Sequence, residues 1–254
     1  MLARTQKWSA VLAVVLCLSA GGVGANEELY QKAAPSCALI TRPGAAGTGW
    51  LVDAEHRLMI TAGHVVAKEG GFYETVEVVF AQVKDGAVIN DREHYDRNRA
   101  TLVIKARVVV HDRRRDLAIL ELETVPAGVQ ALKLADKSPR PGADVHVIGN
   151  STVNLGALFA YCQGKVRNVF RWDPPTNPIV ARVVSHHAPT NHGDSGGPVL
   201  NNHGEVVAFI SLGTDGVPPP KGEDFHAVQV TDHSIAVEEI RAALSDLATK
   251  VATR

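Results

Sequence analysis

The strongest constraint on the fold is a recurrence of short runs rich in Val, Ile and Leu, separated by Gly, Pro, Asp and Asn. Runs of this length bounded by turn residues are typical of β-strands. Candidate strands number twelve, and the first six span about 37–42, 48–53, 58–61, 75–83, 101–110 and 117–122. The other six span about 143–149, 157–169, 179–184, 197–201, 205–211 and 225–230. Short strands at this spacing predict an all-β chain of two packed antiparallel barrels or sandwiches.

A less regular stretch from Pro126 to Pro141 separates the two sets of strands. We therefore expect a first unit over 26–125, a linker over 126–138 and a second unit over 139–231, with a binding site in the crevice between them. The apolar spacing changes to three and four residues after 231, at Ala236, Ile240, Ala243, Leu244 and Leu247. This period predicts a C-terminal α-helix over 232–254, capped by Asp232 or Ser234.

The segment from Lys84 to Thr101 is polar, with acidic and basic residues interspersed. Such a pattern predicts a solvated hairpin loop. A flap that contacts a substrate is the alternative interpretation.

The first residues have the order of a secretory signal peptide. Arg4 and Lys7 precede an apolar run from Ser9 to Ala20, and small residues follow up to Ala25. This order predicts removal of residues 1–25. The apolar run is shorter than the roughly 20 residues that span a bilayer, so we expect a secreted or periplasmic protein with no stable membrane insertion after cleavage.

Composition excludes several classes of protein. Hydrophobic residues make up 45% of the 254 residues and charged residues 21%, a balance typical of a globular chain and not of a disordered one or a coiled coil. Cleavage of the signal would leave 24 basic and 27 acidic residues. This acidic balance argues against a nucleic-acid partner.

Export would leave two cysteines, Cys37 and Cys162, in an oxidising compartment. We expect a disulfide between them, and two buried free thiols are the alternative.

We expect no metal site, since His186, His187 and His192 share no regular ligand spacing with a fourth partner. We also expect no cofactor.

The segment 191–198, NHGDSGGP, holds one hydroxyl in a tight glycine-rich turn. A serine becomes a nucleophile when a base lies within hydrogen-bond reach and a third group orients that base. The chain offers both groups, His64 in TAGHVV after one expected strand and Asp116 in RDLAIL before another. In the alternative, non-catalytic interpretation, Ser195 is a turn residue, His64 is a core histidine, and Asp116 pairs with one of the arginines at 113–115. We expect this arginine run to be a solvated rim.

The three segments, in the order His, Asp, Ser, resemble those of the chymotrypsin-type serine endopeptidases. Two further segments, GTGWLV at 47–52 and APTN at 188–191, are similar to those of the bacterial trypsin-like and HtrA-type branch. The resemblance is to the protease domain of that branch, without PDZ modules. The resemblance covers roughly 35–245 and implies two six-stranded antiparallel β-barrels, the chymotrypsin-like double barrel, followed by the helix.

The resemblance also implies a mechanism, which is that of the Ser-His-Asp triad of these endopeptidases. Ser195 would attack the scissile carbonyl, His64 would carry the proton, and Asp116 would orient the imidazole. The amides of Gly193 and Ser195 would form the oxyanion hole. The walls of the substrate pocket would come from Pro189, Thr190, Asn191, His192, Ser211, Leu212, Gly213, Phe225 and His226.

The implied function is a serine endopeptidase acting on proteins or peptides through an acyl-enzyme. The alternatives are a catalytically silent protease-like binding protein and an ester hydrolase with the same triad; the sequence leaves the oligomeric state open.

Pro189 stands where trypsin has an acid, so we expect cleavage after small or medium apolar residues. The Ile-Val-Gly-Gly terminus that pairs with the aspartate before the serine in digestive enzymes has no counterpart at Asn26, so Asp194 needs another partner or lies near solvent.

Overall fold

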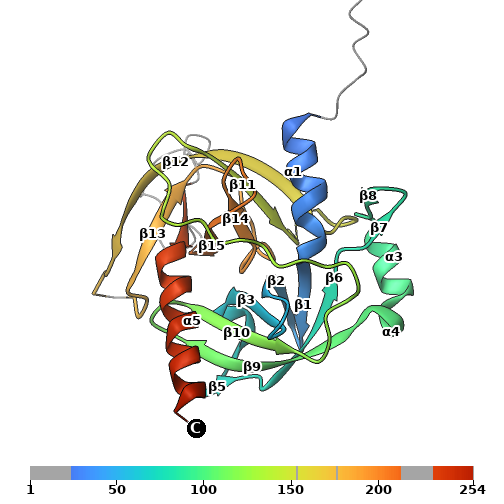
Figure 1. Cartoon of the computed structure of the whole chain (residues 1–254), viewed down its shortest axis with the longest axis horizontal. Helices are drawn as coiled ribbons and strands as arrows, with labels where there is room; N and C mark the ends of the chain where they lie inside the picture. Colours follow the sequence, from blue (N-terminus) through green and yellow to red (C-terminus); the bar gives the residue numbers. More distant parts are fainter. Residues whose placement is uncertain (1–23, 153, 176, 213–230, 254) are drawn as a thin grey trace, which may run out of the picture.

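The computed structural model describes residues 24–152, 154–175, 177–212 and 231–253. It contains two closed six-stranded antiparallel β-barrels and a C-terminal helix, as the resemblance implied (Figure 1). The first barrel is closed in the order β1-β2-β3-β10-β9-β6 and the second in the order β11-β12-β13-β16-β15-β14.

The first barrel comprises β1 (Cys37–Arg42), β2 (Ala45–Asp53), β3 (Leu58–Ala62), β6 (Thr75–Phe80), β9 (Ile104–Asp112) and β10 (Leu117–Leu122). The second comprises β11 (Asp144–Gly149), β12 (Ala160–Trp172), β13 (Ala181–His186), β14 (Pro198–Leu200), β15 (Val206–Leu212) and β16 (Asp232–Ala236). All six expected strands of the first barrel and five of the second are present near their expected positions. The expected strand at 225–230 lies outside the described residues.

A single cluster of buried apolar side chains extends through both barrels, from Trp50 and Ile119 in the first to Phe209 and Ile235 in the second. A second cluster, which includes Val147 and Val199, belongs to the second barrel alone. Burial of this continuous core is the main stabilising contribution to the fold.

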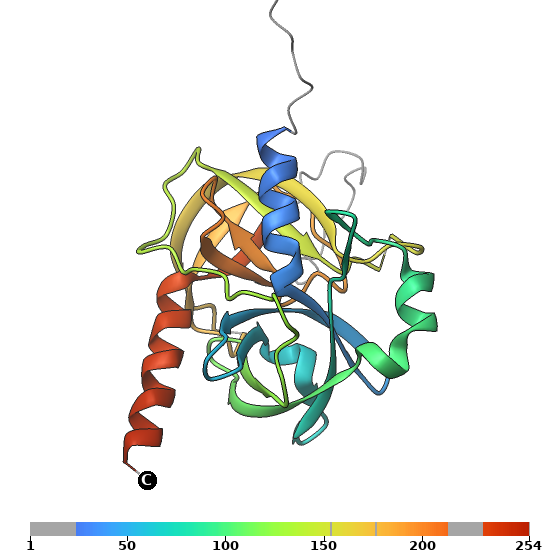
Figure 2. The same ribbon diagram turned by 45° about the vertical axis from the view of Figure 1, so that its right-hand side comes forward.

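The C-terminal helix α5 (Val237–Ala252) begins later than expected, because Asp232–Ala236 form β16 and close the second barrel. Asp232 and Ser234 therefore do not cap it, and its N-cap residue is Ala236. The helix starts at the second barrel and runs along the outside of the first (Figures 1 and 2). It thus connects the two barrels.

Shorter elements lie around the barrels. They are α1 (Ala25–Ala33), the 3₁₀-helix η1 (Ala34–Ser36), α2 (Gly63–Val66), α3 (Arg92–Arg97), α4 (Arg99–Leu102) and the hairpins β4 (Ala67–Lys68) with β5 (Gly71–Phe72) and β7 (Val83–Lys84) with β8 (Ala87–Val88). The segment expected as one solvated loop therefore contains part of a hairpin and two helices, which cover one side of the first barrel (Figure 2). Tyr95 anchors this segment, since its side chain is only 3% exposed and its hydroxyl donates to the Ile89 carbonyl.

Every helix in the described ranges is too short or too polar to cross a bilayer. The expected signal peptide lies almost entirely outside those ranges.

Candidate active site

The pairing of β3 with β10 brings His64 and Asp116 together. Ala62, the last residue of β3, is the register partner of Leu117, the first residue of β10. His64 follows the one by two residues and Asp116 precedes the other by one, so both lie at the same end of the first barrel.

Asp116 holds His64 through two hydrogen bonds. The Asp116 Oδ1 atom accepts the His64 backbone N–H at 2.8 Å, and Oδ2 lies 2.7 Å from His64 Nδ1. Because a carboxylate only accepts hydrogen bonds, Nδ1 carries the proton and Nε2 is left with a free lone pair. The Ser211 hydroxyl donates a further bond of 2.6 Å to Asp116 Oδ2.

The surroundings raise the pKa of His64 above its ordinary value. Removal of the ring from water lowers this pKa, but the hydrogen bond and the negative charge of Asp116 raise it by more. Asp116 therefore stabilises the imidazolium form, which a general base must pass through.

The Ser195 loop is fixed by main-chain contacts at the edge of the second barrel. The Gly196 N–H donates to the Ile210 carbonyl at 2.7 Å, which holds Ser195 beside the end of β15. Gly193 and Gly196 have φ values of 96° and 88°, a region that favours glycine. A Cβ on Gly196 would meet the Thr48 carbonyl oxygen at 2.1 Å, so this position has no room for a side chain.

Two amide groups of this loop face no acceptor. The His192 carbonyl accepts the Thr152 N–H at 2.8 Å, and because the peptide is trans the Gly193 N–H points the opposite way. Among the described residues, neither the Gly193 N–H nor the Ser195 N–H donates a hydrogen bond, and the Ser195 hydroxyl makes none either. This arrangement can bind a developing oxyanion.

Thr48 connects the barrels at the loop, and sequence reasoning assigned it no role. Its N–H donates to the Ser195 carbonyl at 2.8 Å and its hydroxyl to the Gly193 carbonyl at 2.7 Å. The same hydroxyl accepts the Asn150 N–H at 3.0 Å, and the Thr48 side chain is fully buried. Its place between two glycines in GTGWLV was the available signal.

Asp194 is buried, 5% exposed, and accepts the Asn191 N–H at 2.8 Å. It therefore does not lie near solvent, and a main-chain donor serves where digestive enzymes use a charged terminus. Burial, with a smaller contribution from the charge of Asp232, raises the pKa of Asp194 to about 6, although the hydrogen bond from the Asn191 N–H opposes the shift. Asp232 is 3% exposed and accepts the Thr190 hydroxyl at 2.6 Å, so a second buried carboxylate lies beside the expected pocket wall.

The structure brings together only part of the expected pocket wall. Pro189, Asn191 and His192 are exposed beside Thr190, while Ser211 is 8% exposed and contacts Asp116 instead. Gly213, Phe225 and His226 lie outside the described residues, as does the side chain of Leu212.

The expected disulfide is wrong. Cys37 and Cys162 are both free thiols on strands of different barrels. The Cys37 thiol donates to the Ala33 carbonyl at 3.6 Å and the Cys162 thiol to the Pro189 carbonyl at 3.0 Å. Each thiol thus has its own acceptor.

The expectation of a solvated arginine rim holds for Arg113 and Arg114, which are exposed, but not for Arg115, whose side chain is 25% exposed. The carboxylate of Asp116 bonds His64 and Ser211, and none of the three arginines.

Comparison with known proteins extends the sequence resemblance. The periplasmic serine endoprotease DegP of Salmonella typhimurium is 27% identical over 195 residues, which cover 74% of this chain and 32% of DegP. The serine protease Rv3671c of Mycobacterium tuberculosis is 30% identical over 111 residues, 42% of this chain and 27% of that protein. The chain thus spans about a third of the length of these relatives or less.

Solved structures share the fold. The active form of the Rv3671c protease has a TM-score of 0.64 at 21% identity, covering 96% of this chain and 94% of that one. Its inactive form has a TM-score of 0.63 at 22% identity, covering 88% and 94%.

The model of the trypsin-like peptidase domain family matches residues 47–209, a range that includes His64, Asp116 and Ser195. With more than half of its length inside this match, the chain belongs to the trypsin-like peptidase family.

Proposed function

We propose that this protein is a secreted or periplasmic serine endopeptidase that uses His64, Asp116 and Ser195. One observation carries the proposal: a histidine held by one carboxylate, through its backbone N–H and its imidazole Nδ1, is combined with two main-chain N–H groups that have no acceptor among the described residues.

In the proposed reaction, a substrate carbonyl enters beside Ser195, and the serine hydroxyl turns toward His64 Nε2. The hydroxyl oxygen attacks the carbonyl carbon while Nε2 takes its proton, and the Gly193 and Ser195 amides stabilise the oxyanion. His64 then donates the proton to the leaving amine. Water, activated by the same imidazole, hydrolyses the acyl-enzyme and restores Ser195.

Covalent labelling tests the nucleophile. A fluorophosphonate probe is added to the chain from Asn26 to Arg254, and mass spectrometry locates the adduct. We expect one adduct on Ser195, none in Ser195→Ala, and wild-type labelling in Ser245→Ala, since Ser245 is exposed on α5. A folded wild-type protein that stays unlabelled would contradict the proposal and favour the protease-like binding protein.

Hydrolysis assays separate the remaining alternatives. A labelled protein that cleaves unfolded casein acts as an endopeptidase. A labelled protein that hydrolyses only carboxylic esters is the ester hydrolase instead.

For substrate preference, we propose cleavage after small or medium apolar residues, because Pro189 supplies no charge. A peptide-library digest measures this preference directly. Cuts predominantly after Arg or Lys would overturn it and would assign the charge recognition to the buried Asp232 carboxylate beside Thr190.

The proposed location is supported by the signal-like order of residues 1–25 and by the periplasmic location in the name of DegP. Fractionation of the source cells, with determination of the N-terminal residue, tests it. Asn26 as the first residue in the exported fraction is the expected result, and an intact Met1 in the cytosol would contradict it.

A further inference from the structure

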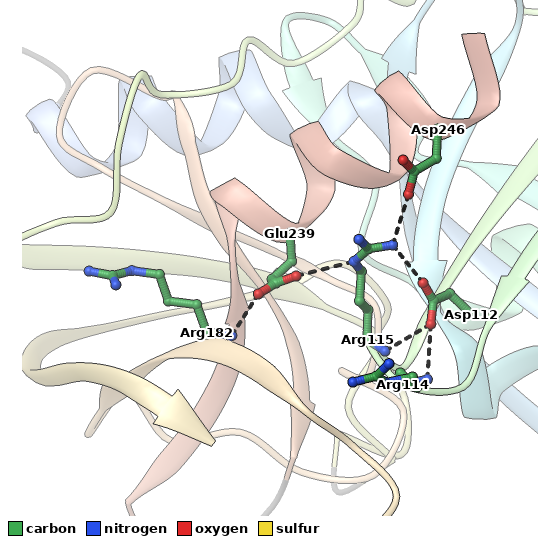
Figure 3. Close-up of polar contacts among 6 residues, drawn as sticks. All are labelled: Asp112, Arg114, Arg115, Arg182, Glu239 and Asp246. Carbon is green, nitrogen blue, oxygen red and sulfur yellow. Dashed lines mark hydrogen bonds and ion pairs between the residues drawn. The ribbon is translucent and has the colours of Figure 1, made fainter. Parts of the chain in front are cut away.

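Arg115, the residue directly before Asp116, is held by three carboxylates (Figure 3). Its Nη1 atom lies 2.8 Å from Asp112 Oδ2 and 3.1 Å from Asp246 Oδ2, and its Nε atom lies 3.1 Å from Glu239 Oε2. Asp112 ends β9, whereas Glu239 and Asp246 lie on α5. The guanidinium fork therefore connects the turn before Asp116 to two positions on the C-terminal helix.

The turn itself is built around Asp112. The second oxygen of this carboxylate accepts the N–H groups of Arg114 at 2.9 Å and Arg115 at 3.0 Å. Asp116 then adopts φ of 44°, a conformation that is uncommon for a residue other than glycine. Such a conformation persists only where the surroundings hold it.

Part of the surroundings of the turn is tied to the second barrel. Glu239 Oε1 accepts the Arg182 N–H of β13 at 2.8 Å, so the carboxylate that binds Arg115 is itself fixed to that barrel. A main-chain hydrogen bond ties the turn to the same strand directly, since the N–H of Val180, the residue before β13, donates to the Arg114 carbonyl at 2.7 Å. Ser195 lies in the second barrel as well, while His64 and Asp116 belong to the first.

We propose that Arg115 is a positioning residue: by binding Glu239 and Asp246 of α5, it sets where the Asp116 carboxylate lies, and so aims His64 at Ser195. The inference rests on the proposed function. Arg115 contacts neither His64 nor Ser195 in the described residues, so its effect passes through Asp116.

The pKa of His64 separates positioning from a direct effect of charge. Removal of a nearby positive charge alone would raise that pKa, since the imidazolium would be repelled less. Loosening the Asp116 carboxylate would lower it, because Asp116 is what holds the pKa above its ordinary value. The two effects therefore have opposite signs.

The main test compares Arg115→Gln with Arg113→Gln, which removes the same charge from an exposed position in the same turn. NMR of ¹⁵N-histidine-labelled protein measures the pKa of His64 and the downfield proton on Nδ1. In Arg115→Gln we expect the pKa to fall by about half a unit or more and the proton signal to weaken. We also expect kcat for peptide hydrolysis to fall about tenfold or more, with KM within about twofold. Arg113→Gln should match the wild type.

Glu239→Gln provides a second route that leaves the turn unchanged. Its amide oxygen can still accept the Arg182 N–H, but its NH₂ group then faces the Nε–H of Arg115, so donor meets donor. We expect the same loss of kcat and of the Nδ1 proton signal, and this variant carries the test if Arg115→Gln does not fold. Arg115→Lys, which keeps the charge without the fork, should be intermediate.

A lower melting temperature with unchanged His64 pKa, Nδ1 signal and kcat would overturn the inference and leave Arg115 a purely structural residue. A raised His64 pKa, or equal effects of Arg115→Gln and Arg113→Gln, would overturn it in favour of simple electrostatics. Because the NMR readout needs no turnover, an inactive wild type whose His64 pKa still falls in Arg115→Gln would contradict the proposed function and support the positioning role.

Discussion

The two barrels contribute to the site by different means. In the first, His64 is held by the Asp116 carboxylate, which also accepts the Ser211 hydroxyl of the second barrel. In the second, the loop around Ser195 is held largely by main-chain contacts and by glycines that leave no room for a Cβ, with the Thr48 hydroxyl as an added donor. The His64 side of the site therefore depends mainly on functional groups and the Ser195 side mainly on backbone conformation, and substitutions in them should fail in different ways.

Asp116→Asn should produce the largest loss of activity and should leave the backbone conformation unchanged. The two carboxylate oxygens of Asp116 accept the His64 N–H, the His64 Nδ1–H and the Ser211 hydroxyl, whereas asparagine has only one acceptor oxygen. Its NH₂ group would face one of these donors. We expect kcat to fall by about 10⁴-fold, the loss typical of this substitution in a chymotrypsin-type triad, with little change in stability. The acid limb of the pH–rate profile should also move to lower pH, because Asp116 raises the pKa of His64. Steady-state kinetics and thermal unfolding together test this, and a large loss of stability would contradict the distinction between the barrels.

Gly196→Ala should do the reverse and destabilise the fold. The new methyl group would meet the Thr48 carbonyl oxygen at 2.1 Å and Thr61 Oγ1 at 2.3 Å. We expect a loss of about 4 kcal/mol in the free energy of unfolding, measured in urea, together with loss of labelling at Ser195. Gly204→Ala is the matched control, because Gly204 has φ of 74° and open space around it, so only the strain of about 1 to 2 kcal/mol remains.

Asp194→Asn tests the buried charge of the second barrel. A pKa of about 6 in the folded state lies above the ordinary value of 3.8, so the native state resists ionisation. Wild-type stability contributed by the neutral carboxyl is present below pH 3.8 and is lost as the pH rises through about 6. Relative to Asp194→Asn, which cannot ionise, the wild type should lose roughly 3 kcal/mol across this window.

Urea unfolding at pH 4, 5, 6 and 7 measures the effect of Asp194. Asp136→Asn, which removes a carboxylate from the exposed surface, provides the matched control. Parallel curves for the wild type and Asp194→Asn would contradict the raised pKa.

Thr48→Val tests the joint between the barrels and should lower the free energy of unfolding by less than Gly196→Ala does. The substitution removes the donor to the Gly193 carbonyl and the acceptor of the Asn150 N–H, with almost no change in volume. We expect a loss of about 2 kcal/mol and a lower rate of Ser195 labelling. Thr75→Val, at an exposed position at the start of β6, should cost less than about 0.5 kcal/mol and leave labelling unchanged.

Most strands could be predicted because apolar runs between turn residues reflect burial directly. The expected bounds of β1 and β10 agree with the structure at both ends. The helices were harder. Helix α1 was missed, although Glu27 and Glu28 in its first turn and Lys32 in its last are helix signals. In α3, the Asp91 side chain caps the helix by accepting the Glu93 N–H, a local signal hidden within a charged segment.

The sequence alone determined the succession of strands along the chain, because it follows from the hydrophobic pattern, and the resemblance of its motifs implied the double barrel and the pairing of His64 with Asp116. Tertiary structure decided what lies between distant segments: the free thiols of Cys37 and Cys162, the burial of Asp194 and Asp232, and the role of Thr48. It also decided that Arg115, one of three adjacent arginines, binds α5 while Arg113 is exposed. Adjacent residues of one type differ only in the direction of their side chains, and that direction is set by elements more than a hundred residues away.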